Sequence, residues 1–405
     1  MNKPIFEIAD ILQEGFSRYD KTFGPLQPEH YKVANAIMAC RTSLLGGHVD
    51  QCDNCKHLSI SYNSCRNRHC PKCQTLLRAQ WIENRMSDLL PVHYFHVVFT
   101  IPHELNAFAL RNKKTFYTLF FQAVSETLMA FGRDEKYLGG EIAFFAILHT
   151  WGQNLMDHPH IHCVVPGGAL MADGTWKHCP KDFLFPVKPL SALFKGKLLD
   201  FFKRAIDSGD IDLCGNLEQY KNNSIRQDLL DKLYKTQWVV YVKPPFAGPQ
   251  AVVKYTGQYT HRVAISNTRL VSVDEKSVAF KWKDYADGNK HKIMTLDTVE
   301  FIRRFMLHVI PTGFVRIRHY GFLSNRSHKG KLNKCREALG VKPENQQHDS
   351  EENHTEHKPQ HWYDLVIKFT GIDPTICPLC KTGHLRKIQE ISATSPPLPV
   401  ALKAA

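Results

Sequence analysis

The chain of 405 residues lacks the features that mark several protein classes. It contains no uninterrupted apolar run of roughly 18 residues, so no segment suggests a membrane span. Residues 1–10 carry two acidic side chains and no signal-peptide pattern, and no internal repeat is detectable. The chain has fewer acidic than basic residues, with 39 Asp and Glu against 52 Lys and Arg, which gives a net charge of +13. This balance favours a polyanionic partner, above all nucleic acid, over a surface that is basic only for solubility.

The cysteines do not suggest the disulfide framework of a small secreted protein, because they cluster as Cys-x-x-Cys pairs in a long chain. That pattern is typical of metal binding in a reducing cytosol. Two pairs separated by a short loop predict one tetrahedral structural zinc site, whose expected ligands are Cys52, Cys55, Cys70 and Cys73. Three neighbours could replace a ligand or help to build a second site: Cys65, His48 and His69.

A further Cys-x-x-Cys pair, Cys377 and Cys380, lies near the C-terminus and is half of a zinc site. His384 and an upstream His or Cys could complete a possible second zinc site there. Three basic residues lie between the expected ligands, namely Arg66, Arg68 and Lys72, and they suit contact with phosphate groups, although they would equally suit a solvated face.

The middle of the chain predicts an antiparallel β-hairpin, with one strand over residues 142–153 and the next beginning near His158. Side chains alternate along a strand, so His160 and His162 point to one face and could share a divalent metal ion. The hairpin would bring His149 or Gln153 close to them as a third ligand. The alternative is a pair of hydrogen-bonded core histidines. A preceding strand is expected at residues 92–101, and a helix over 104–137.

Downstream, a strand near residues 238–243 precedes a helix that begins at Pro249. Tyr255 and Tyr259 are four residues apart and share one face of that helix. They could pack with hydrogen-bonded hydroxyls, or a phenol could act as a nucleophile beside a metal ion and cations. The polar and cationic neighbours expected to contact DNA are Lys254, His261 and Arg262.

The remaining sequence predicts a β-hairpin around residues 278–296 and a helix that opens with a capping box at Asp297. Residues 314–320 are basic and aromatic, so Arg316 and Arg318 could form a DNA-binding face or an edge strand. A basic helix over 329–339 follows, then a polar linker and a Pro- and Ala-rich tail expected to be disordered.

Several separate strings, taken together, resemble one family. His158-Pro159-His160-Ile161-His162 followed by the two tyrosines resembles the HUH endonucleases with two tyrosines. The longer strings His149-Thr150-Trp151-Gly152-Gln153, Tyr259-Thr260-His261-Arg262 and Tyr320-Gly321-Phe322-Leu323-Ser324-Asn325 are similar to the rolling-circle transposases of the insertion sequence 91 family. The cysteine segment that ends at Cys73 resembles the N-terminal zinc-binding region of that family, so the resemblance covers residues 48–325.

The resemblance implies a mechanism. His160 and His162 would hold Mg²⁺ or Mn²⁺ against a phosphate of single-stranded DNA, and Tyr255 or Tyr259 would attack to form a 5′-phosphotyrosine. The partners would be transposon ends and target DNA, with no membrane, and the setting would be the bacterial cytoplasm near the nucleoid. Two alternatives stay open: a replication initiator or relaxase with the same chemistry, and a non-catalytic zinc DNA-binding protein. Monomer and dimer both stay open.

The expected fold class is α+β, an HUH-endonuclease core of antiparallel sheet with flanking helices, an N-terminal helical and zinc-knuckle region and a small C-terminal extension. The expected domains are an N-terminal helical segment (1–45), a zinc-binding domain (46–80), a catalytic domain (81–265), a DNA-binding hairpin with helices (266–340), a linker (341–361), the Cys-x-x-Cys segment (362–390) and a tail (391–405).

Overall fold

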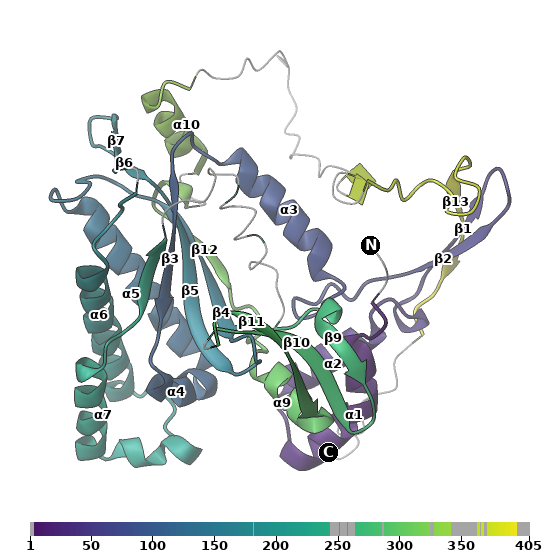
Figure 1. Ribbon diagram of the computed structural model, residues 1–405, viewed down its shortest axis with the longest axis horizontal. Coiled ribbons are helices and arrows are strands. Elements are labelled where there is room, and N and C mark those ends of the chain that lie inside the picture. Colours follow the sequence, from purple (N-terminus) through teal and green to yellow (C-terminus); the bar gives the residue numbers. More distant parts are fainter. Residues whose placement is uncertain are drawn as a thin grey trace.

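A five-stranded antiparallel sheet lies at the centre of the computed structural model (Figure 1). The structure describes residues 4–394 apart from 181, 244–250, 252–256, 258–263, 286, 325–327, 342–362, 365 and 368–370. The strand order of this sheet is β12-β4-β5-β3-β8, so among its described strands β4 and β5 are the one pair adjacent both in the sheet and in the sequence. The strands are β3 (Tyr94–Thr100), β4 (Phe144–Trp151), β5 (Asp157–Pro166), β8 (Val240–Lys243) and β12 (Ile317–Tyr320). This confirms the predicted mixture of helices and antiparallel sheet, and it confirms the hairpin of β4 and β5.

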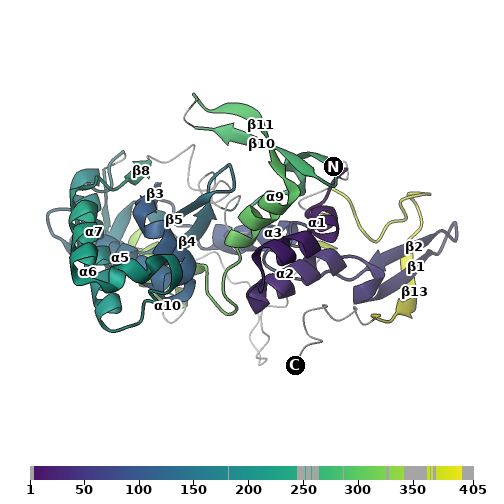
Figure 2. The same cartoon turned by 90° about the horizontal axis from the view of Figure 1, so that it is seen from below.

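One face of the sheet is mainly apolar. Alternate residues of β3, namely Phe95, Val97 and Phe99, are fully buried in the largest core of the described residues. That core is completed by α5 (Lys113–Arg133) and α6 (Val187–Asp207), which cover this face with α7 (Asn223–Lys235) beside them (Figures 1 and 2). Burying so many aromatic rings gives the sheet a rigid support.

The helix predicted over residues 104–137 is two helices, α4 (Asn106–Arg111) and α5. Asn112 separates them with a non-helical backbone (φ −115°, ψ 41°). Its side-chain amide donates to the carbonyl of Phe108 at 3.2 Å and to that of Asp212 at 3.1 Å. An asparagine that satisfies its hydrogen bonds locally competes with helix continuation, which explains the break.

The opposite face of the sheet is covered only in part. α3 (Gln74–Ser87) lies over it, and Trp81 packs edge-on against Phe145 of β4 with ring centroids 5.2 Å apart. The turn η5 (Gly321–Leu323) and α10 (His328–Ala338) add the buried side chains Phe322 and Leu332. By the alternation of strand residues, this second face also carries the histidines of β4 and β5.

A second body of the fold, with its own hydrophobic core, is built from elements in both halves of the sequence. α1 (Ile8–Phe23) and α2 (Pro28–Ala39) share a core with α9 (Thr298–Leu307) and the sheet of β9 (Leu270–Val273), β10 (Ser277–Asp284) and β11 (Lys290–Asp297). A Cβ atom on Gly15 of α1 would lie 2.6 Å from Thr298 Cγ2, so α1 meets α9 at a close approach that needs glycine. The predicted hairpin is confirmed. Of the predicted capping box the structure has the N-cap half, in which the Asp297 carboxylate accepts from the amide of Val299 at 2.8 Å. The Glu300 carboxylate instead binds Arg303 and Arg304.

A third, three-stranded sheet has the order β13-β1-β2 and lies at the far edge of the molecule (Figures 1 and 2). Its strands are β1 (Gly47–Cys52), β2 (Leu58–Tyr62) and β13 (Leu385–Ile391). The C-terminal extension therefore pairs with the zinc-knuckle region instead of standing alone. The shorter elements are η1 (Ser43–Leu45), η2 (His103–Leu105), η3 (Gly215–Lys221), η4 (Asn267–Arg269) and the pair β6 (Gly168–Leu170) and β7 (Trp176–His178). None of the helices in the described ranges is long and apolar enough to cross a membrane.

Candidate active site and metal centres

Three histidines converge on the partly covered face of the central sheet. His149 of β4 is directly opposite His160 of β5 in the strand register, and His162 follows two residues later on the same face. One ring nitrogen from each of the three lies within 4.8 Å of the others, close enough for all three to hold one metal ion. The structure therefore brings the predicted pair, His160 and His162, together. The third histidine of the cluster is His149, and the alternative candidate Gln153 is not part of it. Gln153 lies in the turn beyond β4, where its amide contacts the hydroxyl of Tyr285 at 3.5 Å.

Hydrogen bonds set which ring nitrogens can face a metal ion. Nδ1 of His160 lies 2.7 Å from the carbonyl oxygen of His158, and because a carbonyl only accepts, Nδ1 carries the proton. The lone pair of His160 is then on Nε2. Nδ1 of His162 lies 2.8 Å from Nε2 of His96 in β3, so a proton is shared between these two rings. If His162 donates, its Nε2 carries the lone pair that could bind a cation.

His96 lies in the strand expected at residues 92–101, and its place beside His162 was not predicted. Its ring stacks on that of His162 with centroids 5.0 Å apart and an interplanar angle of 12°. A partner on the second nitrogen of a metal-binding histidine fixes the ring and its tautomer. The alternation of side chains along a strand shows which face of β3 His96 is on. The order of strands in the sheet, which the sequence does not show, is what puts β3 next to β5.

Burial keeps these imidazoles neutral. It lowers the pKa of His160 to about 4 and holds the pKa of His162 well below its usual range. Burial likewise lowers the pKa of His96 to about 4. The neutral ring is the form that binds metal ions, so the cluster does not have to lose protons to accept one near neutral pH.

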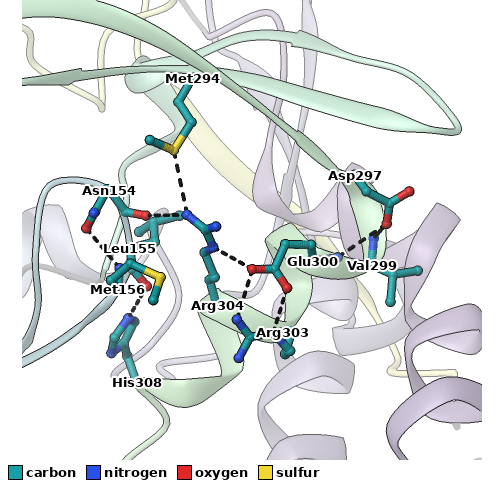
Figure 3. A network of polar contacts seen from close by, with 10 residues as sticks. All are labelled: Asn154, Leu155, Met156, Met294, Asp297, Val299, Glu300, Arg303, Arg304 and His308. Carbon is teal, nitrogen blue, oxygen red and sulfur yellow. Dashed lines mark hydrogen bonds and ion pairs between the residues drawn. The ribbon is translucent and has the colours of Figure 1, made fainter. Parts of the chain in front are cut away.

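The turn between β4 and β5 is held by the second body (Figure 3). Its backbone carbonyls accept hydrogen bonds from side chains that come later in the chain: Arg269 to Gln153 at 2.6 Å, Arg304 to Asn154 at 3.1 Å and His308 to Leu155 at 3.0 Å. Leu155 has a positive φ of 62°, a conformation that needs such support outside glycine. Because Nε2 of His308 donates to that carbonyl, its Nδ1 accepts from the hydroxyl of Thr150 at 3.2 Å, next to His149.

The predicted nucleophiles Tyr255 and Tyr259 lie outside the described residues, as do Lys254, His261 and Arg262. Gly257, midway between the tyrosines, is described and buried. A Cβ atom built on Gly257 would lie 2.6 Å from Cδ1 of Ile82 in α3. Gly257 therefore lies against the helix that lies over the histidine-bearing face of the sheet.

The predicted single zinc site of Cys52, Cys55, Cys70 and Cys73 is wrong, because the structure separates the two pairs. The second pair instead joins Cys65 and Cys40, a residue at the end of α2 that the sequence did not single out. Sγ of Cys73 lies 3.5 Å from that of Cys40 and 3.6 Å from that of Cys65. A disulfide needs about 2.05 Å, whereas the edge of a zinc–thiolate tetrahedron is about 3.8 Å, so this first cysteine cluster fits zinc.

The first pair, Cys52 and Cys55, meets the C-terminal pair, Cys377 and Cys380, in a second cysteine cluster. The proposed ligand His384 is not a member; instead its backbone N–H donates to Asp53 Oδ1 at 2.8 Å. His48 and His69 also lie outside both clusters. His48 pairs with Asp50 at 3.2 Å, and Nε2 of the buried His69 accepts from the amide of Ile310 at 3.4 Å.

The predicted DNA contacts differ in their exposure. Arg66 is exposed, at a positive φ of 52°. Arg316 is only 8 % exposed, which contradicts a position facing DNA, and burial lowers its pKa to about 10. Three others are engaged within the protein: Arg68 donates to the carbonyl of Phe314 at 2.6 Å, Lys72 pairs with Glu7 at 2.8 Å, and Arg318 lies 4.3 Å from the ring centroid of Phe121.

Comparisons with known proteins agree with this arrangement. Residues 143–331 match the family model described as "Putative transposase", and residues 11–101 match the one described as "Transposase zinc-binding domain". The first range contains the histidine cluster, and the second contains all members of the first cysteine cluster. No solved structure matches the chain.

Two curated relatives extend over nearly the whole sequence. The chain is 46 % identical over 396 residues to "Putative transposase y4qJ" of Sinorhizobium fredii (strain NBRC 101917 / NGR234), covering 96 % of this chain and 97 % of that protein. It is 26 % identical over 361 residues to "Transposase for insertion sequence element IS801" of Pseudomonas savastanoi pv. phaseolicola, covering 88 % and 83 %. Together with the zinc-binding model, these matches show that the chain belongs to the insertion sequence 91 family of transposases.

Proposed function

We propose that this transposase cuts single-stranded DNA at the histidine cluster through a covalent phosphotyrosine, and then passes the strand to a target in rolling-circle fashion. The observation that carries the proposal is the convergence of His149, His160 and His162 on the sheet face over which α3 lies, together with the contact between α3 and Gly257. The histidines would hold the metal ion, and the segment that contains Tyr255 and Tyr259 would supply the nucleophile.

Three imidazoles on neighbouring strands fit one divalent ion, and the lowered pKa values of His160 and His162 leave those two rings neutral. Mn²⁺ or Mg²⁺ would be held by His149, His160 and His162, with substrate oxygens or water completing the coordination. When bound, such an ion withdraws charge from a non-bridging oxygen of the scissile phosphate. The hydrogen bond of His160 to the His158 carbonyl would hold the first ring in place, and His96 would orient His162.

The phenol oxygen of Tyr255 or Tyr259 would attack phosphorus in line. The new bond joins that oxygen to phosphorus, the phenol proton passes to solvent, and the bond from phosphorus to O3′ breaks. The departing oxygen takes up a proton, which leaves a free 3′-hydroxyl and a 5′-phosphate esterified to tyrosine. Because the ester keeps the free energy of the original phosphodiester, attack by a 3′-hydroxyl can rejoin strands without ATP. The second tyrosine allows a second strand to be cut while the first stays attached.

The strand itself would be bound by cations and aromatic rings around the site. Exposed Arg66 supports this part of the proposal, as do the expected contacts of Lys254, His261 and Arg262. Transposon ends and target DNA would be bound in turn.

The test is incubation of the protein with a single-stranded oligonucleotide from an element end and Mn²⁺ or Mg²⁺. We expect a covalent protein–DNA adduct that survives denaturing electrophoresis and is lost in the Tyr255→Phe plus Tyr259→Phe variant. Tyr241→Phe is the matched control, because Tyr241 is an exposed tyrosine on β8 of the same sheet. Failure of the wild-type protein to form an adduct with any of several end sequences would refute the proposal. Transfer of the bound strand to a second oligonucleotide tests the later step.

A further inference from the structure

The second cysteine cluster joins segments more than three hundred residues apart. Sγ of Cys52 lies 3.7 Å from that of Cys380, and Sγ of Cys55 lies 3.6 Å from that of Cys377. These distances are far longer than a disulfide bond of about 2.05 Å and close to the edge of about 3.8 Å expected for four thiolates around zinc. All four cysteines are free, and their sulfur atoms lie within 4.8 Å of one another.

The two halves of the cluster repeat one backbone geometry. In each half the residue after the second cysteine is a lysine with a φ of 59°, Lys56 in one and Lys381 in the other. The amide of each lysine donates to the carbonyl of the first cysteine of its pair, at 3.2 Å for Lys56 and 3.0 Å for Lys381. Backbone N–H groups also point at the sulfur atoms: that of Cys55 donates to Cys52 Sγ at 3.4 Å, and that of Gly383 to Cys380 Sγ at 3.3 Å. Two equivalent tight turns that present sulfur to one point are the form of a tetrahedral metal site.

The surrounding sheet holds the two halves in register. β1 and β13 pair antiparallel, and the pairing brings Cys52 opposite Leu385. Beyond the strands, the amide of Asp53 donates to the carbonyl of His384 at 3.0 Å, and Asn54 Nδ2 donates to Thr382 Oγ1 at 3.0 Å. Gly383 is in such close contact that an added Cβ atom would lie 2.7 Å from Cβ of Asn54 and would also collide with Cys52 Sγ.

This three-stranded sheet has few buried apolar side chains to stabilise it. The side chains of Leu58 and Ile60 on β2 are 54 % and 57 % exposed, and Ile388 on β13 is 54 % exposed. Cys52 and Cys377, by contrast, are fully buried. Small folds without a hydrophobic core depend on a metal ion or disulfides, and here the sulfur spacing excludes disulfides.

We propose that Cys52, Cys55, Cys377 and Cys380 bind a second structural zinc ion, which fastens the C-terminal segment to the N-terminal zinc-binding region. This ion would be separate from the one in the first cysteine cluster, whose members all lie between residues 40 and 73. Neither matching family model reaches Cys377 or Cys380, since the models end at residues 101 and 331. The proposal concerns the architecture of the chain and is independent of the tyrosine chemistry.

The first experiment measures zinc per chain in the purified full-length protein by mass spectrometry under native conditions and by elemental analysis. We expect two zinc ions in the wild-type protein and one in the Cys377→Ser plus Cys380→Ser variant. The matched control replaces two cysteines outside both clusters, Cys179→Ser plus Cys214→Ser, and should retain two. A C-terminal double variant that keeps the wild-type zinc content would overturn the proposal.

The second experiment stays decisive even if that variant fails to fold. A protease site is introduced between residues 345 and 355 of the otherwise unchanged full-length chain, and the purified protein is cut. We expect the fragment that contains Cys377 and Cys380 to co-elute with the rest of the protein while zinc is bound, and to separate after a chelator removes the metal. Separation of the fragment in zinc-containing buffer would overturn the proposal, as would retention after complete removal of zinc.

Discussion

The histidine cluster and the two cysteine clusters are built in opposite ways. The histidines lie on paired strands of one hairpin, within fourteen residues of sequence, and the apolar core behind the sheet holds them in place. The cysteines lie at the ends of elements and in turns, and the second cluster draws on both ends of the chain. If the proposed function holds, the fold prepares the histidine site for a metal ion, whereas zinc stabilises the fold around the cysteines. Loss of metal should therefore damage structure at one kind of site and activity at the other.

The largest effect is expected at the first cysteine cluster. Cys73→Ser removes a ligand that lies within the core shared by α1, α9 and β10. Structural zinc contributes on the order of 10 kcal/mol, which is comparable to the whole stability of a domain. We expect the cooperative thermal transition of this body to be lost, as measured by calorimetry or circular dichroism. Cys214→Ser, at an exposed cysteine outside the clusters, is the control. A Cys73→Ser protein that melts like the wild type would show that the cysteine cluster does not stabilise the fold, and the contrast with the histidine cluster would be lost.

At the histidine site, His162→Ala should slow the chemistry strongly and leave the fold intact. A divalent ion that stabilises the charged phosphate contributes several kcal/mol, so we expect adduct formation to slow by about 10²–10³-fold. Zinc content and melting temperature should stay unchanged. His158→Ala is the matched control, since this exposed neighbour is outside the cluster. A protein that unfolds on this change would show that the histidine site is also structural.

A smaller effect is expected for His96→Ala, because His96 acts on the metal site through His162. Partners of this kind change metal affinity by about 10–100-fold. The Mn²⁺ concentration that gives half-maximal adduct formation should rise by that factor, while the rate at saturating Mn²⁺ stays close to that of the wild type. An unchanged Mn²⁺ dependence would remove His96 from the site.

Gly257→Ala tests whether α3 positions the tyrosine segment. The new methyl group would overlap Ile82, and overpacking of this kind costs about 1–3 kcal/mol. We expect slower adduct formation that is restored when Ile82→Ala makes room. Gly196→Ala in α6, where an added Cβ meets nothing within 4 Å, is the control. No rescue in the double variant would mean that the contact does not position the nucleophile.

The smallest effect is expected in the pH dependence of the stability of the fold, through Asp157 at the start of β5. Burial raises the pKa of Asp157 to about 7, with an opposing contribution from nearby Lys113, while an unfolded Asp has a pKa near 3.9. The folded protein therefore holds this proton more tightly than the unfolded chain, and its stability falls as the pH rises from about 4 to 7. Asp157→Asn should stabilise the protein by about 1–2 kcal/mol at pH 8, after allowance for partial exposure, and by nothing at pH 4.

Denaturant unfolding at the two pH values measures this difference. Asp228→Asn, at an exposed carboxylate on α7, is the control and should show no such gain. Equal stabilisation by Asp157→Asn at both pH values would mean that the change acts through packing and not through charge.

The sequence predicted the features that depend on short spacing. Alternation along one strand was enough to place His160 and His162 on one face, and the hairpin narrowed the third position to His149 or Gln153, of which the structure selects His149. The side-chain cap at Asp297 was equally local. Pairings between distant segments could not be predicted, because the Cys-x-x-Cys pattern shows that two thiols converge but not which second pair they meet. Cys40 has no local pattern at all, and His96 depends on the order of strands in the sheet.

The hydrogen bonds from the second body to the β4–β5 turn matter for the order in which the histidine site is completed during synthesis. Arg269, Arg304 and His308, which hold that turn, and β12, which completes the edge of the sheet, are all translated after the histidines. At about 5–20 residues per second, a ribosome needs roughly 8–30 s to proceed from the end of β5 to the end of β12. A nascent chain therefore carries its histidines for some time without their supports. The histidine cluster gains these supports only after the ribosome has passed residue 320, so a chain interrupted earlier would lack them.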